Sequence, residues 1–451
     1  MEGNGHSPEN EMNDPGKLFV KTFGCQMNVY DTEKIYAFLQ DSYVPAASEE
    51  EADVIILNTC SIREKAEQKV YSLLGRIKPL KDVKPNLLIG VGGCVAQQEG
   101  ERILRRSPAV DIVFGTHNVD ELPRLLEERI RFGKRVCRVR EDTGTVPTSD
   151  APRVMGSKRA TALLTIMKGC DNYCAYCVVP LVRGREASRP APEILDEAIF
   201  LVENGVREIT LLGQNVNSYH DPDTGAGFVS LLESMELVPG LERLRFVTSH
   251  PKDFSPELAH AMADLSSVCE HIHLPVQAGS DRVLSAMKRG YSSRQYMDKI
   301  ELLTKLIPEV EFTTDFIVGF PGEKRVDFER TLDMLSVVKY QNAFSFRFSP
   351  RPGTAAAAME DPVDAEVKRP WLPELQNLQN QVTAEKHQNM VGREVEVLVE
   401  SVDKKKSCFL EGRTRTNYIV HFPGDSALIG QMVQVKLASS RTIHLIGEMV
   451  N

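Results

Sequence analysis

Short apolar runs alternate with helical patterns over the first 140 residues of the chain. Parallel sheets produce this alternation, because each strand needs a crossover helix before the next strand can pair with it. The pattern therefore predicts an N-terminal parallel α/β sheet domain over residues 17–140. The expected strands are 18–23, 54–57, 87–91 and 111–114, and the expected helices are 28–40, 61–78 and 97–106.

The alternation resumes after residue 160 with at least six further strand-like runs. Six consecutive βα units in about 190 residues favour a partial (β/α)6 barrel over an eight-fold barrel. A helical pattern over 367–390 follows, so the predicted barrel domain spans 160–390. The expected strands are 162–167, 208–213, 243–248, 271–276, 311–319 and 343–348, and the helices between them are 193–203, 228–237, 256–265, 281–288, 294–306 and 325–338.

The C-terminal part, 391–451, changes to the alternation of apolar and polar residues that strands show. Expected strands at 394–400, 418–422, 432–437 and 443–446 are separated by turns at Gly412, Gly424 and Gly430. This pattern predicts a small antiparallel β-barrel.

Two segments show no periodicity. Residues 1–16 are polar and acidic and are expected to form a disordered leader. Residues 141–159 are rich in Pro, Gly, Ser and Thr and are expected to form a linker.

The composition is that of a soluble globular protein, with 42% hydrophobic and 26% charged residues in 451. No apolar run approaches the roughly 20 residues of a membrane span. The chain has nine cysteines, an odd number, and no apolar signal segment is expected. Both observations indicate a reducing, cytoplasmic environment. The net charge of −9 argues against non-specific nucleic-acid binding by the whole surface. The segment 391–451 is close to neutral.

Three cysteines, Cys170, Cys174 and Cys177, lie in a C-x3-C-x2-C run. Three thiolates this close can hold three corners of a [4Fe-4S] cluster and leave the fourth iron open to a substrate. The run resembles the signature of the radical-SAM superfamily, in which S-adenosylmethionine (SAM) binds that iron. A zinc site completed by a histidine is an alternative, although zinc sites usually use C-x2-C pairs. Buried, inert thiols are another.

A second set of three cysteines is spread along the first domain. Cys25, Cys60 and Cys94 each follow or close one of the first three expected strands. The carboxyl ends of parallel strands lie on one edge, beside helix N-termini that favour anionic sulfur. These positions predict a second three-ligand cluster. The alternative is three separate, buried strand-end cysteines.

Several other residues are candidate SAM contacts. Gln214 and Gln277 end expected barrel strands, and the ends of barrel strands face the active-site rim. Gly319 and Gly322 lie in a turn whose exposed amides would meet the carboxylate or ribose of SAM, unless it is a plain strand–helix turn. Arg183 would bind a carboxylate or phosphate, or is a solvated charge.

The motifs together resemble the methylthiotransferase family across nearly the whole chain, and its tRNA-modifying branch most closely. Glu411-Gly-Arg-Thr414 with Asn417 looks like the TRAM barrel of that family, an RNA-binding module with an OB-like fold. The remaining motifs are Gly24-Cys-Gln-Met-Asn28, Asn58-Thr-Cys-Ser-Ile-Arg-Glu-Lys65, Gly90-Val-Gly-Gly-Cys-Val-Ala-Gln97, Gly169-Cys-Asp-Asn-Tyr-Cys-Ala-Tyr-Cys-Val-Val-Pro180, Gln214-Asn-Val-Asn217, 273–280 and 315–323.

The resemblance implies two [4Fe-4S] clusters and SAM as cofactors. The cluster on Cys170, Cys174 and Cys177 would cleave SAM to a 5′-deoxyadenosyl radical, which removes hydrogen from C2 of isopentenyladenosine at position 37 of tRNA. The cluster on Cys25, Cys60 and Cys94 would hold the sulfur that is transferred, and a second SAM would methylate it. The resemblance identifies no catalytic group beyond the cluster ligands.

The expected partners are the isopentenylated tRNA, an electron donor and a sulfur source, with no membrane. Three rival functions remain open at this point. The first is a methylthiotransferase that acts on a ribosomal-protein aspartate. The second is a radical-SAM enzyme whose second cysteine set has no role with sulfur. The third is a non-enzymatic iron–sulfur protein that binds RNA.

Overall fold

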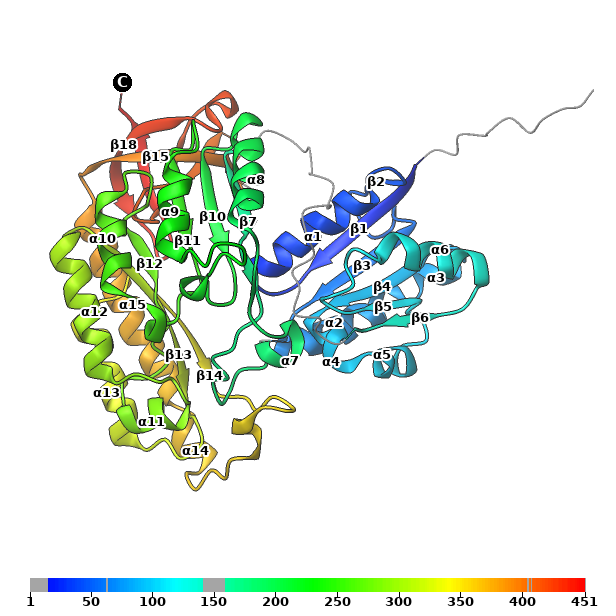
Figure 1. Cartoon of the computed structure of the whole chain (residues 1–451), viewed down its shortest axis with the longest axis horizontal. Coiled ribbons are helices and arrows are strands. Elements are labelled where there is room, and N and C mark those ends of the chain that lie inside the picture. The colour runs from blue at the N-terminus through cyan, green and yellow to red at the C-terminus, as the bar shows by residue number, and fades with distance from the viewer. Residues whose placement is uncertain (1–14, 62–63, 141–158, 404, 407, 451) are drawn as a thin grey trace, which may run out of the picture. The chain divides into compact units, whose positions relative to one another are not determined.

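The computed structural model describes residues 15–61, 64–140, 159–403, 405–406 and 408–450. The expected leader and linker lie almost entirely outside these residues. The described residues form two compact units, 15–140 and 159–450 (Figure 1). None of the described helices is long and apolar enough to cross a membrane.

The first unit is a six-stranded sheet in which every neighbouring pair is parallel, in the order β2-β1-β3-β4-β5-β6. The strands are β1 (Gly16–Thr22), β2 (Tyr43–Pro45), β3 (Val54–Thr59), β4 (Leu88–Gly93), β5 (Ile112–Phe114) and β6 (Val136–Arg138). The helices are α1 (Gln26–Leu39), α2 (Glu64–Ile77), α3 (Leu80–Val83), α4 (Cys94–Glu99), α5 (Glu101–Arg106) and α6 (Leu122–Phe132).

Helices cover both faces of this sheet. Val54 and Ile56 of β3 pack toward α1 and α6, whereas Ile55 and Leu57 pack toward α2 and α5. The predicted parallel α/β sheet is confirmed. The pattern missed the short edge strands β2 and β6 and the helix α6.

The second unit begins with six parallel strands in two groups of three, β11-β10-β7 and β12-β13-β14. A parallel bridge between Leu244 and Val268 connects the two groups. The predicted partial barrel is confirmed, and each of its six strands lies where the pattern placed it. They are β7 (Thr161–Thr165), β10 (Glu208–Leu212), β11 (Arg243–Phe246), β12 (His271–His273), β13 (Glu311–Val318) and β14 (Asn342–Arg347).

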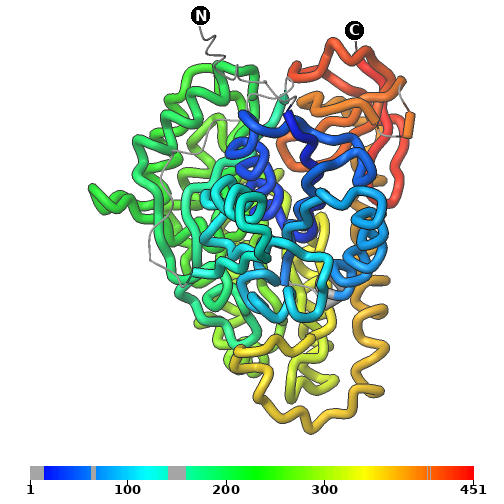
Figure 2. Tube along the Cα trace, turned by 90° about the vertical axis from the view of Figure 1, so that its right-hand side faces the viewer, coloured from blue at the N-terminus to red at the C-terminus, as the bar shows by residue number. Residues whose placement is uncertain are grey.

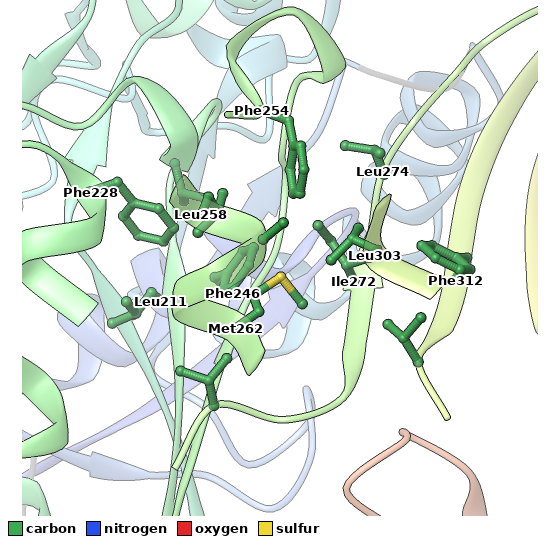
Figure 3. Close-up of a cluster of buried hydrophobic side chains, with 14 of the residues drawn as sticks. Leu211, Phe228, Phe246, Phe254, Leu258, Met262, Ile272, Leu274, Leu303 and Phe312 are labelled. Atoms are coloured by element: carbon green, nitrogen blue, oxygen red, sulfur yellow. The ribbon is translucent and has the colours of Figure 1, made fainter. Parts of the chain in front are cut away.

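Helices pack against these strands through one continuous apolar core. Figure 3 shows Phe246 and Ile272 from neighbouring strands meeting Leu258, Met262 and Leu303 from the helices outside them. The helices are α7 (Val179–Arg183), α8 (Ala191–Glu203), α9 (Phe228–Glu236), α10 (Pro256–Asp264), α11 (Asp281–Ala286), α12 (Ser293–Leu306), α13 (Arg325–Val338), α14 (Ala365–Lys368) and α15 (Trp371–Met390).

Helix starts in the barrel follow from capping side chains. Ser255 accepts a hydrogen bond from the Leu258 amide, and Pro256 is preorganised for the first turn of α10. Ser292 and Gln295 form a reciprocal capping box at the start of α12. These local signals explain why the helix boundaries lie close to those expected.

Helix α15 runs from the partial barrel to the C-terminal strands (Figure 2). There, five strands form a closed barrel in the order β15-β16-β17-β19-β18. All pairings are antiparallel except that of β17 with β19. The predicted barrel is confirmed, but β16 was missed. The strands are β15 (Glu394–Val402), β16 (Phe409–Arg413), β17 (Ile419–Pro423), β18 (Met432–Ser440) and β19 (Leu445–Met449).

The β16–β17 turn of the closed barrel docks onto the amino-terminal end of the six parallel strands. Arg243 donates to the carbonyl oxygen of Arg413 at 2.7 Å. Arg245 donates to the carbonyl oxygens of Thr414 at 2.7 Å and Arg415 at 2.8 Å. In return, the Arg415 guanidinium lies 2.8 Å from the Glu270 carboxylate. The closed barrel therefore covers one end of the strands and leaves their carboxyl ends to the functional loops.

Arg243 gives a test of this docking. Its side chain is fully buried, so Arg243→Met should lower the free energy of unfolding of this unit by about 3 kcal/mol, because the Arg413 carbonyl loses its donor. Urea unfolding followed by fluorescence of Trp371, the single tryptophan, measures the loss. Arg294→Met on the surface of α12, where the side chain is 73% exposed, should change the free energy by less than about 0.5 kcal/mol. Equal stability of the two variants would contradict the docking role.

Candidate active site

The loop that carries Cys170, Cys174 and Cys177 lies between β8 (Met167–Lys168) and α7, beyond the carboxyl end of β7. Gly169 opens it with a φ of +75°, and a Cβ there would lie 1.9 Å from the carbonyl oxygen of Arg185. The Gly169 amide donates to Oε1 of Gln214, and the Ala175 amide donates to the Met287 carbonyl at 2.9 Å. The loop is thus anchored to the end of β10 and to the C-terminus of α11.

The three thiols of this loop influence one another electrostatically. Burial, and after it the neighbouring Cys174 and Cys170, raise the pKa of Cys177 to about 12. Burial is also the largest cause that raises the pKa of Cys170 to about 11. Bound iron reverses this preference, because a metal ion stabilises the thiolate.

The donor set of this loop fits a cluster. Within the described residues, no group of three or more His, Cys, Asp or Glu side chains is arranged to hold a single metal ion. In a [4Fe-4S] cluster each thiolate binds its own iron, so the three sulfurs stand further apart than the ligands of one ion. Three thiols on one short loop supply the number and kind of ligands that such a cluster takes.

Two side chains from other loops reach Cys174. The Arg289 Nη1 lies 3.4 Å from the Cys174 sulfur, and the His250 Nε2 lies 3.7 Å from it. Burial, with the positive charges of Arg289 and Lys252, lowers the pKa of His250 to about 2. Sequence reasoning missed both residues. His250 follows β11 closely, so the strand-end rule that selected Gln214 and Gln277 also covers it.

A polar network ties the cysteine loop to the ends of β10 and β11. Asn215 donates to Asp253 at 2.7 Å and accepts from the His250 amide at 3.2 Å. Asn172, which lies between the cysteines, donates to the same Asp253 carboxylate at 3.3 Å. The Lys252 ammonium donates to Asn172 at 2.5 Å. These bonds hold the loop against the rim of the barrel.

Buried polar atoms without a protein partner gather just beyond β10 and β11. Among the described residues they include Nε2 of Gln214, both amide atoms of Asn217 and the hydroxyl of Ser249. Buried polar groups are nearly always hydrogen-bonded, to protein, water or a ligand. This part of the rim therefore offers hydrogen-bonding groups to a polar cofactor.

The other expected SAM contacts differ in their surroundings. Gln277 is buried with a φ of +75°, and its backbone pairs with β13. Arg183 is buried as the last residue of α7. Gly319 and Gly322 both adopt positive φ, but their amides are already hydrogen-bonded within the chain. The Gly319 amide donates to Glu323 at 2.5 Å, and the Gly322 amide donates to Asp361 at 3.0 Å.

The second set of cysteines lies at the carboxyl ends of three adjacent strands, β1, β3 and β4. Cys25 precedes α1, Cys60 follows β3, and Cys94 is the first residue of α4. Thr59 and Gly93 are partners in the register of β3 and β4, so Cys60 and Cys94 leave the sheet side by side. A Cβ on Gly24 would lie 2.7 Å from the Cys60 sulfur. The three loops therefore converge at one edge of the sheet.

Two asparagines fix these loops, and the sequence did not single them out. The Asn28 side chain donates to the carbonyl oxygens of Phe23 and Thr59, both at 2.9 Å. The Asn58 side chain donates to the Asn28 carbonyl at 2.8 Å. Asn28 and Asn58 thus connect the loops of Cys25 and Cys60.

Three family descriptions match successive parts of the chain. The uncharacterized protein family UPF0004 matches residues 17–115, the radical SAM superfamily matches 164–335, and the TRAM domain matches 388–450. The first covers the loops of Cys25, Cys60 and Cys94, the second covers the Cys170 loop, and the third covers the closed barrel.

Curated relatives match over almost the whole chain. A tRNA-2-methylthio-N(6)-dimethylallyladenosine synthase of Moorella thermoacetica is 50% identical over 436 residues, which are 96% of this chain and 98% of that protein. Proteins of the same name from Syntrophotalea carbinolica and Geobacter sulfurreducens are 47% and 48% identical over 96% of this chain and 99% and 97% of their own lengths. This chain belongs to the tRNA-2-methylthio-N(6)-dimethylallyladenosine synthase family.

Solved structures place this synthase-family chain within the radical-SAM fold. The radical S-adenosylmethionine methyltransferase TsrM from Kitasatospora setae, with cobalamin and a [4Fe-4S] cluster, aligns with a TM-score of 0.55 at 14% identity, over 76% of this chain and 77% of TsrM. The cobalamin-dependent radical enzyme OxsB aligns with a TM-score of 0.51 at 13% identity, over 81% of this chain and 56% of OxsB. At these identities the likeness concerns the fold alone.

Gly169→Ala tests the anchoring of the cysteine loop in this synthase-family protein. The change should abolish iron binding by the loop, because the new Cβ would collide with the Arg185 backbone. Gly205→Ala is the matched control, since Gly205 has a φ of +96° and no atom within 4 Å of the added carbon. It should cost only about 1–2 kcal/mol of stability. The iron content of both variants is measured after anaerobic reconstitution. Full iron content in Gly169→Ala would contradict the expected loss of iron binding by the loop.

Glu323 gives a pH-dependent test of the 319–322 turn. Burial raises the pKa of Glu323 from 4.5 to about 7. Because the folded pKa is raised, the contribution of this group to stability is full below pH 4.5 and is lost as the pH rises through 7. Glu323→Gln keeps an oxygen that can accept from the turn amides and has no proton to lose.

The wild type should therefore lose roughly 3 kcal/mol relative to Glu323→Gln between pH 4.5 and 8, at about 1.4 kcal/mol per pKa unit. Urea unfolding at several pH values measures this difference. Glu301→Gln on exposed α12, where the side chain is 58% exposed, should retain the wild-type profile. Parallel profiles for wild type and Glu323→Gln would contradict the assignment.

Proposed function

We propose that this protein converts N6-isopentenyladenosine at position 37 of tRNA to 2-methylthio-N6-isopentenyladenosine. The observation that carries the proposal is the loop of Cys170, Cys174 and Cys177, which is anchored on the barrel rim. A curated tRNA-2-methylthio-N(6)-dimethylallyladenosine synthase matches 96% of this chain. The convergence of Cys25, Cys60 and Cys94 on one sheet edge supports a second sulfur-bearing site.

Each cysteine set would hold one [4Fe-4S] cluster. When bound, the cluster on Cys170, Cys174 and Cys177 supplies the electron that cleaves SAM and so starts hydrogen removal from C2 of the adenine, while the cluster on the other set supplies sulfur. The proposed SAM contacts are Gln214, Gln277, Gly319, Gly322 and Arg183. Because the amides of Gly319 and Gly322 already donate to carboxylates of the chain, these glycines would act by letting the backbone approach the cofactor.

The side chains of the rim perform three tasks in this proposal. Gln214 fixes the opening of the cysteine loop through the Gly169 amide, and its buried Nε2 is left to bind the cofactor. Asn217 and Ser249 supply further buried hydrogen-bonding groups for a polar cofactor. Asn215 and Asp253 keep the loop in register with the strands. Together they orient the cofactor before the tRNA arrives.

We assign the chain to three functional domains at 17–140, 160–390 and 391–451, connected by a linker over 141–159. The last domain would contact the tRNA. The backbone of the β16–β17 turn docks onto the partial barrel, and the Arg413 side chain donates to Asn417 at 3.0 Å. RNA contacts would therefore come from other parts of this domain than the Arg413–Asn417 pair.

The remaining partners follow from the chemistry. Cleavage of SAM consumes an electron, and each methylthio group consumes a sulfur atom, so an electron donor and a sulfur source are required. The proposed tRNA substrate and the need for reduced thiols support a cytoplasmic location.

The decisive experiment supplies the anaerobically reconstituted protein with SAM, a strong reductant and tRNA that carries isopentenyladenosine. Mass spectrometry of the digested tRNA should detect a methylthio group on that adenosine. The wild type should bind about eight irons, four for each cluster. Cys174→Ala and Cys25→Ala should each bind about four and form no product.

Cys408→Ala is the matched control, because Cys408 is exposed and belongs to neither set. This variant should keep all its iron and its activity. If SAM is cleaved but the tRNA stays unmodified, the substrate is wrong, and a ribosomal-protein peptide with the target aspartate becomes the next substrate to test. If SAM is not cleaved by the fully loaded protein, the proposed reaction is wrong.

A further inference from the structure

Two side chains that belong to neither cysteine set point at one cluster ligand. We propose that His250 and Arg289 raise the reduction potential of the cluster on Cys170, Cys174 and Cys177 by donating N–H···S hydrogen bonds to the Cys174 sulfur. This inference rests on the proposed function, because it takes Cys174 to be a ligand of the SAM-binding cluster.

The His250 ring can donate to sulfur from only one of its nitrogens. Its Nδ1 accepts a hydrogen bond from the Lys252 amide at 3.1 Å. A nitrogen that accepts carries no proton, so the ring proton is on Nε2. Nε2 is the atom that lies 3.7 Å from the Cys174 sulfur. The backbone of the loop beyond β11 thus selects the tautomer that donates to the ligand.

Arg289 is held in one orientation by its other contacts. Its Nε donates to the Tyr291 hydroxyl at 3.0 Å, and its Nη2 donates to the Pro275 carbonyl at 2.6 Å. The third direction of the planar guanidinium, through Nη1, leads to Cys174 at 3.4 Å and to the Tyr176 hydroxyl at 3.3 Å. Because Nε and Nη2 are already bound, the guanidinium keeps Nη1 at the sulfur and loses little further conformational freedom in doing so.

The charge of Arg289 also requires an anionic neighbour. Its side chain is only 4% exposed, and within the described part of the chain no carboxylate forms an ion pair with it. A buried cation without a counter-charge is strongly destabilising. The Cys174 thiolate, as a ligand of an anionic cluster, is the group within reach that would balance this charge.

Both contacts favour the reduced cluster. Reduction adds an electron, and part of its charge resides on the ligand sulfurs. Hydrogen bonds and a positive charge at those sulfurs stabilise the more negative state and raise the potential. His250 and Arg289 act on the cluster through Cys174. They are positioning residues, which make the entry of an electron into the cluster more favourable.

The test uses a Cys25→Ala, Cys60→Ala, Cys94→Ala background, in which one cluster remains. Its midpoint potential is measured by redox titration followed by electron paramagnetic resonance. His250→Leu removes the donor and should lower the ratio of reduced to oxidised cluster about tenfold at fixed ambient potential, which is about 59 mV for one electron. His250→Gln, whose amide can donate from a similar position, should restore most of the potential.

Arg289→Met should lower the ratio at least as far, because it removes a donor and a charge. Arg294→Met is the charge control. It removes an exposed cation from α12, where the guanidinium pairs with Asp298 and Glu301 of its own helix. It should leave the ratio within about twofold of the background value.

A second measurement requires no substitution of His250 or Arg289. In the background protein labelled with ¹⁵N-histidine, the reduced cluster should show hyperfine coupling to a histidine nitrogen, carried through the N–H···S bond. Absence of that coupling would overturn the His250 contact. An unchanged potential in both His250→Leu and Arg289→Met would overturn the tuning role while the proposed function stands. Failure of the background to bind about four irons would instead refute the ligand assignment.

Discussion

Parallel pairing directs the carboxyl ends of successive strands to a single edge, and both cysteine sets depend on this constraint. In the first unit, Cys25, Cys60 and Cys94 are far apart in the sequence, yet the order of β1, β3 and β4 makes their loops neighbours. In the second unit, the loops after β10 and β11 bring Gln214 and His250 to the Cys170 loop, and the loop after α11 brings Arg289. The parallel sheet thus brings together side chains from segments that are far apart in the sequence.

The same constraint separates docking from chemistry in the partial barrel. Charged residues at the amino-terminal ends of the strands, among them Arg243, Glu270 and Glu311, bind the closed C-terminal barrel. The carboxyl ends carry residues in unusual backbone conformations instead. Thr248 and Gln277 both have positive φ, although neither is glycine. Such conformations cost energy and persist where the surrounding structure enforces them, which is typical of functional rims.

Local features of the sequence were sufficient to predict much of this structure. The strands of the partial barrel and the cysteine positions follow from alternation and spacing within short windows. The edge strands β2 and β6 were missed because most of their residues are only half-buried or exposed, so they carry little apolar pattern, whereas the equally short β5 is fully buried and apolar. Strand β16 was missed because Gly412 interrupts its alternation. A Cβ at Gly412 would lie 2.3 Å from the Leu398 carbonyl oxygen, so the interruption is itself required by the pairing.

The contacts around Cys174 lay beyond such reasoning, because they join residues 76 and 115 positions apart. The turn at 319–322 shows a related limit. Its glycines were found from the sequence, but the return of Glu323 onto their amides depends on how the chain packs.

The docking of the closed barrel combines backbone and side-chain contacts. Four consecutive carbonyl oxygens, those of Arg413, Thr414, Arg415 and Thr416, accept hydrogen bonds from Arg243, Arg245 and Gln341. The side chains of Arg415 and Tyr418 bind Glu270 and Glu311 in addition. Every amino acid presents the same carbonyl, so a change of side chain at 413, 414 or 416 leaves the backbone bond at that position in place. Arg415 is different, because its attachment to the partial barrel depends on the guanidinium as well.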